Sequence, residues 1–158
     1  MRHSIINYIL LLCLFGAGIA GAQTQEQEQE QEQRVRMKDL PLAVQKTVQE
    51  QSRGAKIRAL TREVEEGKTF FEVELRINGR GRDVLIDPSG AVVETEDQIT
   101  LAEAPAAVKA EIEKQAGKGR IISVESVTKA GAIVFYEAAI RHARKITEIK
   151  ISPDGKMI

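Results

Sequence analysis

The sequence predicts an α+β protein with two tandem units, each consisting of one N-terminal helix packed on a three- to four-stranded antiparallel sheet. Three observations predict this fold class: an internal repeat of about 64 residues, apolar residues at helical spacing at the start of each repeat, and alternating apolar and polar residues after it. Because an amphipathic helix must bury its apolar stripe, each helix is expected to lie on the apolar face of the strands that follow it.

The first 22 residues have the organisation of a secretory signal peptide. Arg2 gives a basic start, residues 9–19 form an apolar run, and the small residues 20–22 offer a cleavage site. A membrane anchor is the alternative, but the apolar run is shorter than the roughly 20 residues that a spanning helix needs. We therefore expect cleavage after Ala22, a mature chain without a membrane span, and a periplasmic or extracellular location.

A polar segment follows the predicted cleavage site. Residues 23–33 read QTQEQEQEQEQ and include no apolar side chain. Such a segment cannot bury enough apolar surface to offset the entropy lost on ordering. The sequence therefore predicts a disordered Gln/Glu-rich linker over residues 23–37.

Sliding the sequence along itself shows an internal repeat between residues 38–99 and residues 100–158. Apolar positions, turn glycines and prolines recur in the same order, with a shift of 64 residues that becomes 65 after an insertion near Ala132. The clearest matches are LPLAV (40–44) with APAAV (104–108), FFE (70–72) with FYE (135–137), and DPSG (87–90) with SPDG (152–155). We interpret the two ranges as tandem copies of one folding unit.

Each repeat begins with a helical pattern. Apolar residues at helical spacing predict helices over residues 41–52 and 105–116, with Val44 and Val48 forming the stripe of the first. A proline stands in the first turn of both predicted helices, where its missing N–H costs no hydrogen bond. Each repeat is thus expected to open with one amphipathic helix.

Antiparallel strands are predicted after each helix. Apolar residues occupy every second position of residues 71–77, and residues 134–141 repeat this alternation. An Asn-Gly pair at residues 78–79 predicts a tight hairpin to a third strand. Polar-rich first strands are predicted over residues 55–65 and 120–129, and a short fourth strand over residues 91–94. The alternation is typical of a sheet with one buried and one solvated face.

The LPLAV helix start at residues 40–44, the strand GKTFFEVE at residues 67–74 and the DPSG turn at residues 87–90 together resemble the PepSY-like proteins, also called beta-lactamase-inhibitor-like proteins. The resemblance extends over nearly all of residues 38–158. It implies an exported bacterial protein with tandem helix-and-sheet units. It implies no active-site residues, and it supplies a precedent in which a related tandem architecture clamps a protein partner with its sheet.

The sequence offers no constellation that predicts catalysis. His142 is the only histidine after cleavage, and its neighbours Arg141 and Arg144 favour a solvated surface residue over a general base or a metal ligand. No serine lies in a Gly-x-Ser-x-Gly elbow, which argues against acyl transfer. With 23 basic and 23 acidic residues, the chain also has no basic excess that would predict nucleic-acid binding. We expect a protein that is not an enzyme and that needs neither a cofactor nor a metal for catalysis.

Two groups of glutamates leave a cation-binding alternative open. Glu63, Glu65 and Glu66 form an acidic cluster, and Glu72 and Glu74 project from one strand face about 7 Å apart. Paired carboxylates can bind calcium, although basic residues surround these and favour a mixed-charge solvated surface. The sequence therefore keeps a small-ligand or calcium sensor as the alternative function.

The preferred hypothesis is a secreted or periplasmic, non-catalytic binding module that holds an unidentified protein or peptide, as an inhibitor or a chaperone. The solvated sheet face or an edge strand would make the contact, because main-chain hydrogen bonds at an edge accept many partner sequences. The predicted contact residues are Phe70, Glu72, Glu74, Arg76, Phe135, Glu137 and Arg141. The chain has no Trp and only two Tyr, so it does not predict the aromatic anchors that tight inhibition of a beta-lactamase would require.

Overall fold

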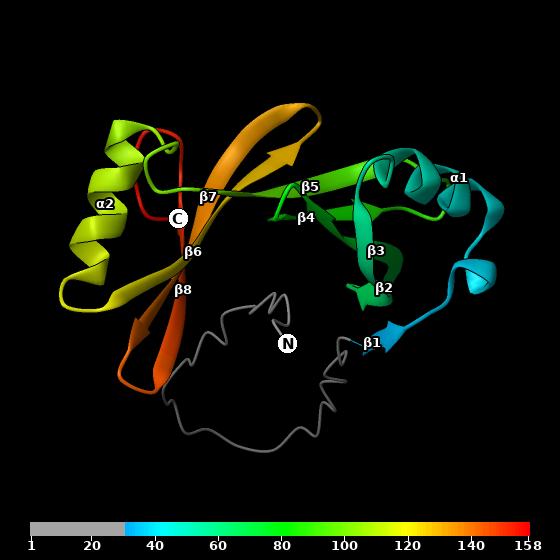
Figure 1. Cartoon of the computed structure of the whole chain (residues 1–158), viewed down its shortest axis with the longest axis horizontal. Coiled ribbons are helices and arrows are strands. Elements are labelled where there is room, and N and C mark those ends of the chain that lie inside the picture. Colours follow the sequence, from blue (N-terminus) through cyan, green and yellow to red (C-terminus); the bar gives the residue numbers. More distant parts are fainter. Residues whose placement is uncertain (1–30) are drawn as a thin grey trace, which may run out of the picture.

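The computed structural model describes residues 31–158, which contain one antiparallel sheet of eight strands paired in sequence order, together with two α-helices and one 3-10 helix (Figure 1). The strands are β1 (Gln31–Arg34), β2 (Lys56–Glu65), β3 (Lys68–Ile77), β4 (Arg80–Ile86), β5 (Val92–Ile99), β6 (Arg120–Lys129), β7 (Ala132–His142) and β8 (Lys145–Ile151). The helices are η1 (Met37–Asp39), α1 (Leu42–Gln51) and α2 (Ala106–Ala116). None of these helices is long and apolar enough to cross a membrane. The predicted signal peptide, residues 1–22, lies outside the described residues.

The predicted α+β fold of two tandem units, each with its own three- to four-stranded sheet, is wrong. The molecule is mostly β, and its strands belong to a single continuous sheet. The difference arises at β5, which was expected to end near residue 94 but continues to Ile99. Its additional residues pair with β6, from Thr95 opposite Thr128 to Ile99 opposite Val124. Because β5 is hydrogen-bonded on both sides, no sheet boundary separates the two repeats.

The predicted linker is also shorter than expected at its C-terminal end. Residues 31–34 form β1, which pairs antiparallel with β2, from Gln31 opposite Val64 to Arg34 opposite Thr61. Composition gave no sign of this strand because backbone hydrogen bonds to a neighbouring strand do not depend on apolar side chains. Residues 23–30 of the predicted linker lie outside the part of the chain that the structure describes.

Both α-helices begin and end within one residue of the predicted ranges. Pro41 and Pro105 precede them as N-cap residues. The stripe of α1 joins a core cluster of Leu40, Val44, Val48, Phe71, Val73, Leu75, Val84 and Ile86. The stripe of α2 joins a second cluster of Ala104, Val108, Ile112, Val124, Tyr136, Ala138 and Ile151. One sheet thus supports two separate apolar cores.

Strand register shows that both helices cover the same face of the sheet. Val84 of β4, a member of the α1 core, pairs with Thr95 of β5. Ile99 lies four residues further along β5, hence on the same face, and pairs with Val124 of the α2 core. Figure 1 shows the two helices at opposite ends of the molecule, with β5 running between them. We call this side the helix-covered face and the opposite side the open face.

Two turns pack closely against the first turns of the helices. Gly90, with φ +88, lies so near Ala43 of α1 that a Cβ would come within 2.8 Å of the Ala43 carbonyl oxygen. Gly155, with φ +86, has the same relation to Ala107 of α2, at 2.8 Å from the Ala107 Cβ. The Thr47 hydroxyl donates a hydrogen bond to the Gly90 carbonyl at 2.6 Å. Only glycine combines this backbone conformation with this close approach.

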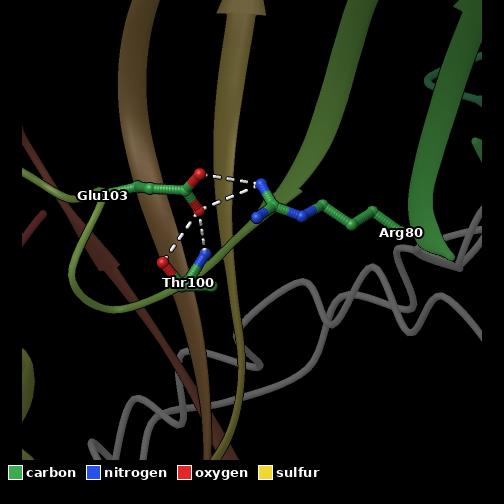
Figure 2. A network of polar contacts seen from close by, with 3 residues as sticks. All are labelled: Arg80, Thr100 and Glu103. Atoms are coloured by element: carbon green, nitrogen blue, oxygen red, sulfur yellow. Dashed lines mark hydrogen bonds and ion pairs between the residues drawn. The ribbon is translucent and has the colours of Figure 1, made fainter. Parts of the chain in front are cut away.

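The connection from β5 to α2 is held by a small polar network (Figure 2). One carboxylate oxygen of Glu103 accepts hydrogen bonds from the Thr100 backbone N–H at 2.6 Å and the Thr100 hydroxyl at 2.8 Å. Arg80, at the start of β4, donates to both carboxylate oxygens of Glu103 at 2.8 and 3.0 Å. These bonds and the nearby positive charge lower the pKa of Glu103 to about 2. The network ties the loop that leads into α2 to the β3–β4 hairpin.

Candidate functional site

The open face carries all seven residues that the sequence predicted as partner contacts. Phe70, Glu72, Glu74 and Arg76 of β3 alternate with residues of the α1 core, and Phe135, Glu137 and Arg141 of β7 alternate with residues on the helix-covered face. The structure therefore brings both groups to one surface. Because β7 is the fourth strand after β3, the groups lie roughly 19 Å apart across the sheet. Their role in binding a partner stays a prediction.

Four further carboxylates lie between these two groups, and sequence analysis missed them. Asp83 of β4 stands beside Glu74 of β3 and beside Glu96 of β5 in one cross-strand row. Glu94 lies two residues before Glu96 on the same face, and Glu125 of β6 pairs with Glu137 of β7. We call the resulting set the acidic band: Glu72, Glu74, Asp83, Glu94, Glu96, Glu125 and Glu137. The alternation of polar residues in β4 and β5 was the available signal for outward-facing carboxylates. It places them on one surface with Glu72 and Glu137 only when these strands are known to belong to one sheet.

Glu72 is the most buried member of the acidic band, with 6% of its surface exposed. Burial raises its pKa to about 10, and the neighbouring carboxylates of Glu63, Asp83 and Glu74 add to the rise. Glu72 also hydrogen-bonds to Glu63. A hydrogen bond between two carboxyl groups requires a proton on one of them, so this pair shares a proton at neutral pH.

Glu96 occupies the centre of the acidic band. Burial raises its pKa to about 9, and repulsion from the nearby carboxylates of Glu137, Glu125, Glu94 and Asp83 contributes to this rise. Carboxylate oxygens of Glu96, Glu125 and Glu137 lie within 4.8 Å of one another. Such oxygens are the ligands that calcium prefers, so these three residues are the part of the band that could hold a cation.

Two lysines reach over the β6–β8 end of the acidic band. Lys129 Nζ lies 2.6 Å from Glu94 Oε2, and Lys150 Nζ lies 2.7 Å from Glu137 Oε1. Both ammonium groups also face the ring of Phe135, at 5.9 and 4.8 Å from its centroid. Burial lowers the pKa of Lys150, but the hydrogen bond and charge of Glu137 outweigh it and raise the pKa overall. The surface therefore holds ammonium groups between carboxylates and an aromatic face.

A small hollow opens in the acidic band between β3, β4 and β5. Its lining consists of four carboxylic acids and one apolar side chain: Glu72, Asp83, Glu94, Glu96 and Leu85. Leu85 lies on the open face because it pairs with both Glu72 and Glu94. The hollow thus combines an apolar wall with several hydrogen-bond acceptors.

Of the other residues weighed in the sequence, His142, Ser89 and Glu66 lie apart from the acidic band, and Glu63 contacts it. His142 is exposed at the end of β7, consistent with a solvated residue. Ser89 belongs to the turn after β4, where its hydroxyl donates to Asp87 at 2.6 Å. The predicted cluster of Glu63, Glu65 and Glu66 divides, because Glu66 lies in the β2–β3 turn with φ +48 whereas Glu63 contacts Glu72.

No protein-family model and no curated protein matches this chain. Solved structures nevertheless share its fold. A candidate periplasmic protein from Bacteroides eggerthii has a TM-score of 0.62 at 18% identity, with 75% of this chain and 86% of that chain covered. A DUF2874 family protein from Bacteroides uniformis has a TM-score of 0.59 at 19% identity, with 75% and 86% covered.

A BLIP-like protein from Bacteroides fragilis is also similar, with a TM-score of 0.55 at 15% identity over 75% of this chain and 83% of that chain. At these identities the likeness shows a common fold and no common activity. The resemblance to beta-lactamase-inhibitor-like proteins is therefore confirmed at the level of the fold. The PepSY-like assignment stays a prediction.

Proposed function

We propose that this protein is an exported, non-catalytic module that binds a protein or peptide on the open face of its sheet. One observation carries the proposal: within residues 31–158 both α-helices cover one face, while the other face carries the predicted contact residues, of which Glu72 is buried, and the acidic band on strands β3 to β7. A continuous sheet holds the backbone of these residues at fixed spacings, so little backbone entropy is lost when a partner binds.

Export and family membership belong to the same proposal. The signal peptide predicted over residues 1–22 would deliver the mature chain to the periplasm or the exterior. A similar fold in a candidate periplasmic protein agrees with that location. The helix start, strand and turn that resemble PepSY-like proteins agree with a binding role rather than with catalysis.

Charge reversal on the open face tests the proposal. The mature chain is immobilised and used to capture proteins from the exported fraction of its native cell, and captured proteins are quantified by mass spectrometry. Glu74→Arg and Arg141→Glu should each reduce capture of a specific partner several-fold, because charge complementarity on a contact surface governs which partner docks. Glu50→Arg, an exposed position on α1, is the matched control. Equal capture by all variants would remove the open face from consideration.

Cation sensing is the second candidate function, favoured by the proximity of the Glu96, Glu125 and Glu137 carboxylates. Lys150 already lies against Glu137, which weakens the case for a divalent ion there. A ligand that binds only the folded chain must raise its melting temperature. Millimolar calcium should therefore raise the melting temperature of the wild type but not of Glu125→Gln, and magnesium should have a smaller effect. An unchanged melting temperature with calcium would dismiss this candidate.

A further inference from the structure

We propose that copies of this chain associate head to tail, with the outer edge of β8 in one copy pairing antiparallel with the outer edge of β1 in the next. This inference goes beyond the proposed function, because it concerns the two edges of the sheet rather than its open face. Its basis is the register of the sheet, which recurs along the chain, so that the internal β4–β5 junction shows how the two outer edges fit together.

Strand pairs in the first half of the sheet recur in the second half with the same register, 64 or 65 residues later. The following pairs correspond: Gln31–Val64 with Thr95–Thr128, Lys56–Arg76 with Arg120–Arg141, Phe71–Ile86 with Tyr136–Ile151, and Ile86–Val92 with Ile151–Met157. By this correspondence β1 is the counterpart of the second half of β5, and β8 is the counterpart of β4.

The outer edges of β1 and β8 are therefore the counterparts of the two edges that meet in the middle of the sheet. There β4 pairs with β5 from Arg82 to Ile86. On the outer side of β8, within residues 31–158, the pairing stops at Ile151, which bridges to Met157. No described strand lies against the outer side of residues 145–149 or of β1. Each edge thus lacks the partner that its counterpart has.

The outer edge of β8 is ready to pair. The Ile158 N–H donates to the Lys150 carbonyl at 3.1 Å on this outer side, so the backbone N–H and C=O groups of Glu148 and Ile146 point to the same side. Residues 145–148 are exposed, and β8 contains neither a proline nor a bulge. An exposed, regular edge of this kind is a template for another strand.

The outer edge of β1 presents matching groups. The Val35 N–H donates to the Leu60 carbonyl at 2.9 Å toward β2, so the backbone groups of Glu32 and Arg34 point outward. The β4–β5 register then predicts two pairs between copies: Glu32 opposite Glu148, as Glu96 lies opposite Asp83, and Gln33 opposite Thr147, as Asp97 lies opposite Arg82. The acidic pair therefore has a counterpart inside the folded chain.

An ion pair at the internal junction has a counterpart at the outer edges as well. Arg80, at the start of β4, contacts Glu103 at 2.8 Å across this junction. The corresponding residues are Lys145, at the start of β8, and Asp39, after β1, and both are exposed. Asp39 and Glu103 lie in matching turns, in which the N–H of each donates to the carbonyl three residues earlier. Opposite charges would thus meet at the corresponding place between two copies.

Pairing between two different edges leaves each copy with one edge available for a further copy. The expected assembly is therefore a row of copies joined in one sheet. A symmetric dimer, in which two β8 strands pair with each other, is the alternative that the experiment must distinguish. Its signature is self-association through β8 alone, without β1.

Sedimentation velocity of the mature chain, residues 23–158, over about a hundredfold range of concentration tests the inference. Glu148→Pro blocks the outer edge of β8, and Glu32→Pro blocks that of β1. Proline removes an outward N–H, a position at which an edge strand tolerates it. Glu148→Gln and Glu32→Gln keep the N–H and are the matched controls. Circular dichroism of each variant checks that it folds.

The wild type and both glutamine variants should form oligomers as the concentration rises. Each proline variant alone should stay monomeric, whereas an equimolar mixture of the two should form a dimer, because each supplies the edge that the other lacks. The inference is overturned if the wild type is monomeric at every concentration, or if the mixture forms no dimer. It is also overturned if Glu32→Pro alone forms a dimer, since two β8 strands would then pair with each other.

A charge exchange tests the register without proline. Lys145→Glu and Asp39→Lys should each weaken association about two- to fivefold, because each brings like charges together. The combined variant Lys145→Glu/Asp39→Lys should associate like the wild type. Glu50→Lys, at an exposed position on α1, is the control and should also associate like the wild type. Single variants that associate normally, or a combined variant that stays weak, would overturn the proposed pairing.

Discussion

The protonated state of Glu96 makes a quantitative prediction about stability. In the folded chain burial and neighbouring carboxylates raise its pKa to about 9, whereas in an unfolded chain a glutamate has a pKa of about 4.3. Between these two values the folded state keeps a proton that the unfolded state releases. The stabilisation linked to that proton is complete below about pH 4.3 and is lost as the pH rises toward 9. Glu96→Gln removes the titration but keeps a neutral side chain of similar shape.

The magnitude follows from the number of protons retained. One proton bound to the folded state alone changes the free energy of unfolding by about 1.4 kcal/mol for each pH unit. From pH 6 to pH 8 the contribution of Glu96 therefore falls by up to about 3 kcal/mol. Glu96→Gln should remove this fall, so that the variant gains stability over the wild type as the pH increases.

Urea denaturation followed by circular dichroism at pH 6, 7 and 8 measures the effect. The slope of unfolding free energy against pH should be less negative for Glu96→Gln than for the wild type. Glu50→Gln, which removes an exposed glutamate from α1, should run parallel to the wild type. A wild-type stability that is constant or increasing over this interval, or parallel curves for Glu96→Gln and wild type, would refute the assigned protonation.

Three further predictions concern the fold. Gly90→Ala should lower the free energy of unfolding by at least about 1 kcal/mol more than Gly79→Ala does. Both glycines have φ near +87, but only at Gly90 would a Cβ meet the α1 backbone. Equal losses of stability in denaturant titrations would contradict this contact. Ile112→Ala, at a fully buried site, should lower the free energy of unfolding by about 2–5 kcal/mol, and the protein should still unfold in a single cooperative transition. Leu42→Ala, at an 83% exposed site, should change the free energy of unfolding little. Two separate unfolding transitions would show that the two cores unfold independently. Glu103→Gln should lower the melting temperature at neutral pH. Because the pKa of Glu103 is lowered to about 2, the difference in melting temperature between variant and wild type should vanish as the pH falls from about 4.5 toward 2. If that difference persists at pH 2, the charge of Glu103 is not its cause.

Local signals made the helices and most strands predictable from sequence. Prolines before α1 and α2, apolar residues at helical spacing, and strict alternation in β3 each depend on residues a few positions apart. The joining of the repeats into one sheet depends instead on β5 pairing with β6. Residues 95–99 of β5 are mostly polar, so their periodicity did not distinguish a central strand from a loop. The same limit applies to β1, whose four residues QEQR include no apolar side chain that would mark it as a strand.

The candidate site was predicted in part for the same reason. Glu72 and Glu137 were found because β3 and β7 alternate so clearly that their outward positions can be read directly. Asp83 and Glu96 were missed because they lie between those strands only in a continuous sheet. The acidic band therefore forms because β3 to β7 lie next to one another in one sheet, and no sequence motif predicts it.

The acidic band costs stability that folding alone does not require. Burying a carboxyl group among other carboxylates is unfavourable unless it takes up a proton, as the raised pKa values of Glu72 and Glu96 show. A glutamine at either position would keep a polar neutral side chain without the repulsion. Groups with strongly perturbed pKa values occur preferentially at functional sites. The unfavourable burial of these carboxyl groups therefore agrees with the binding role that we propose for the open face.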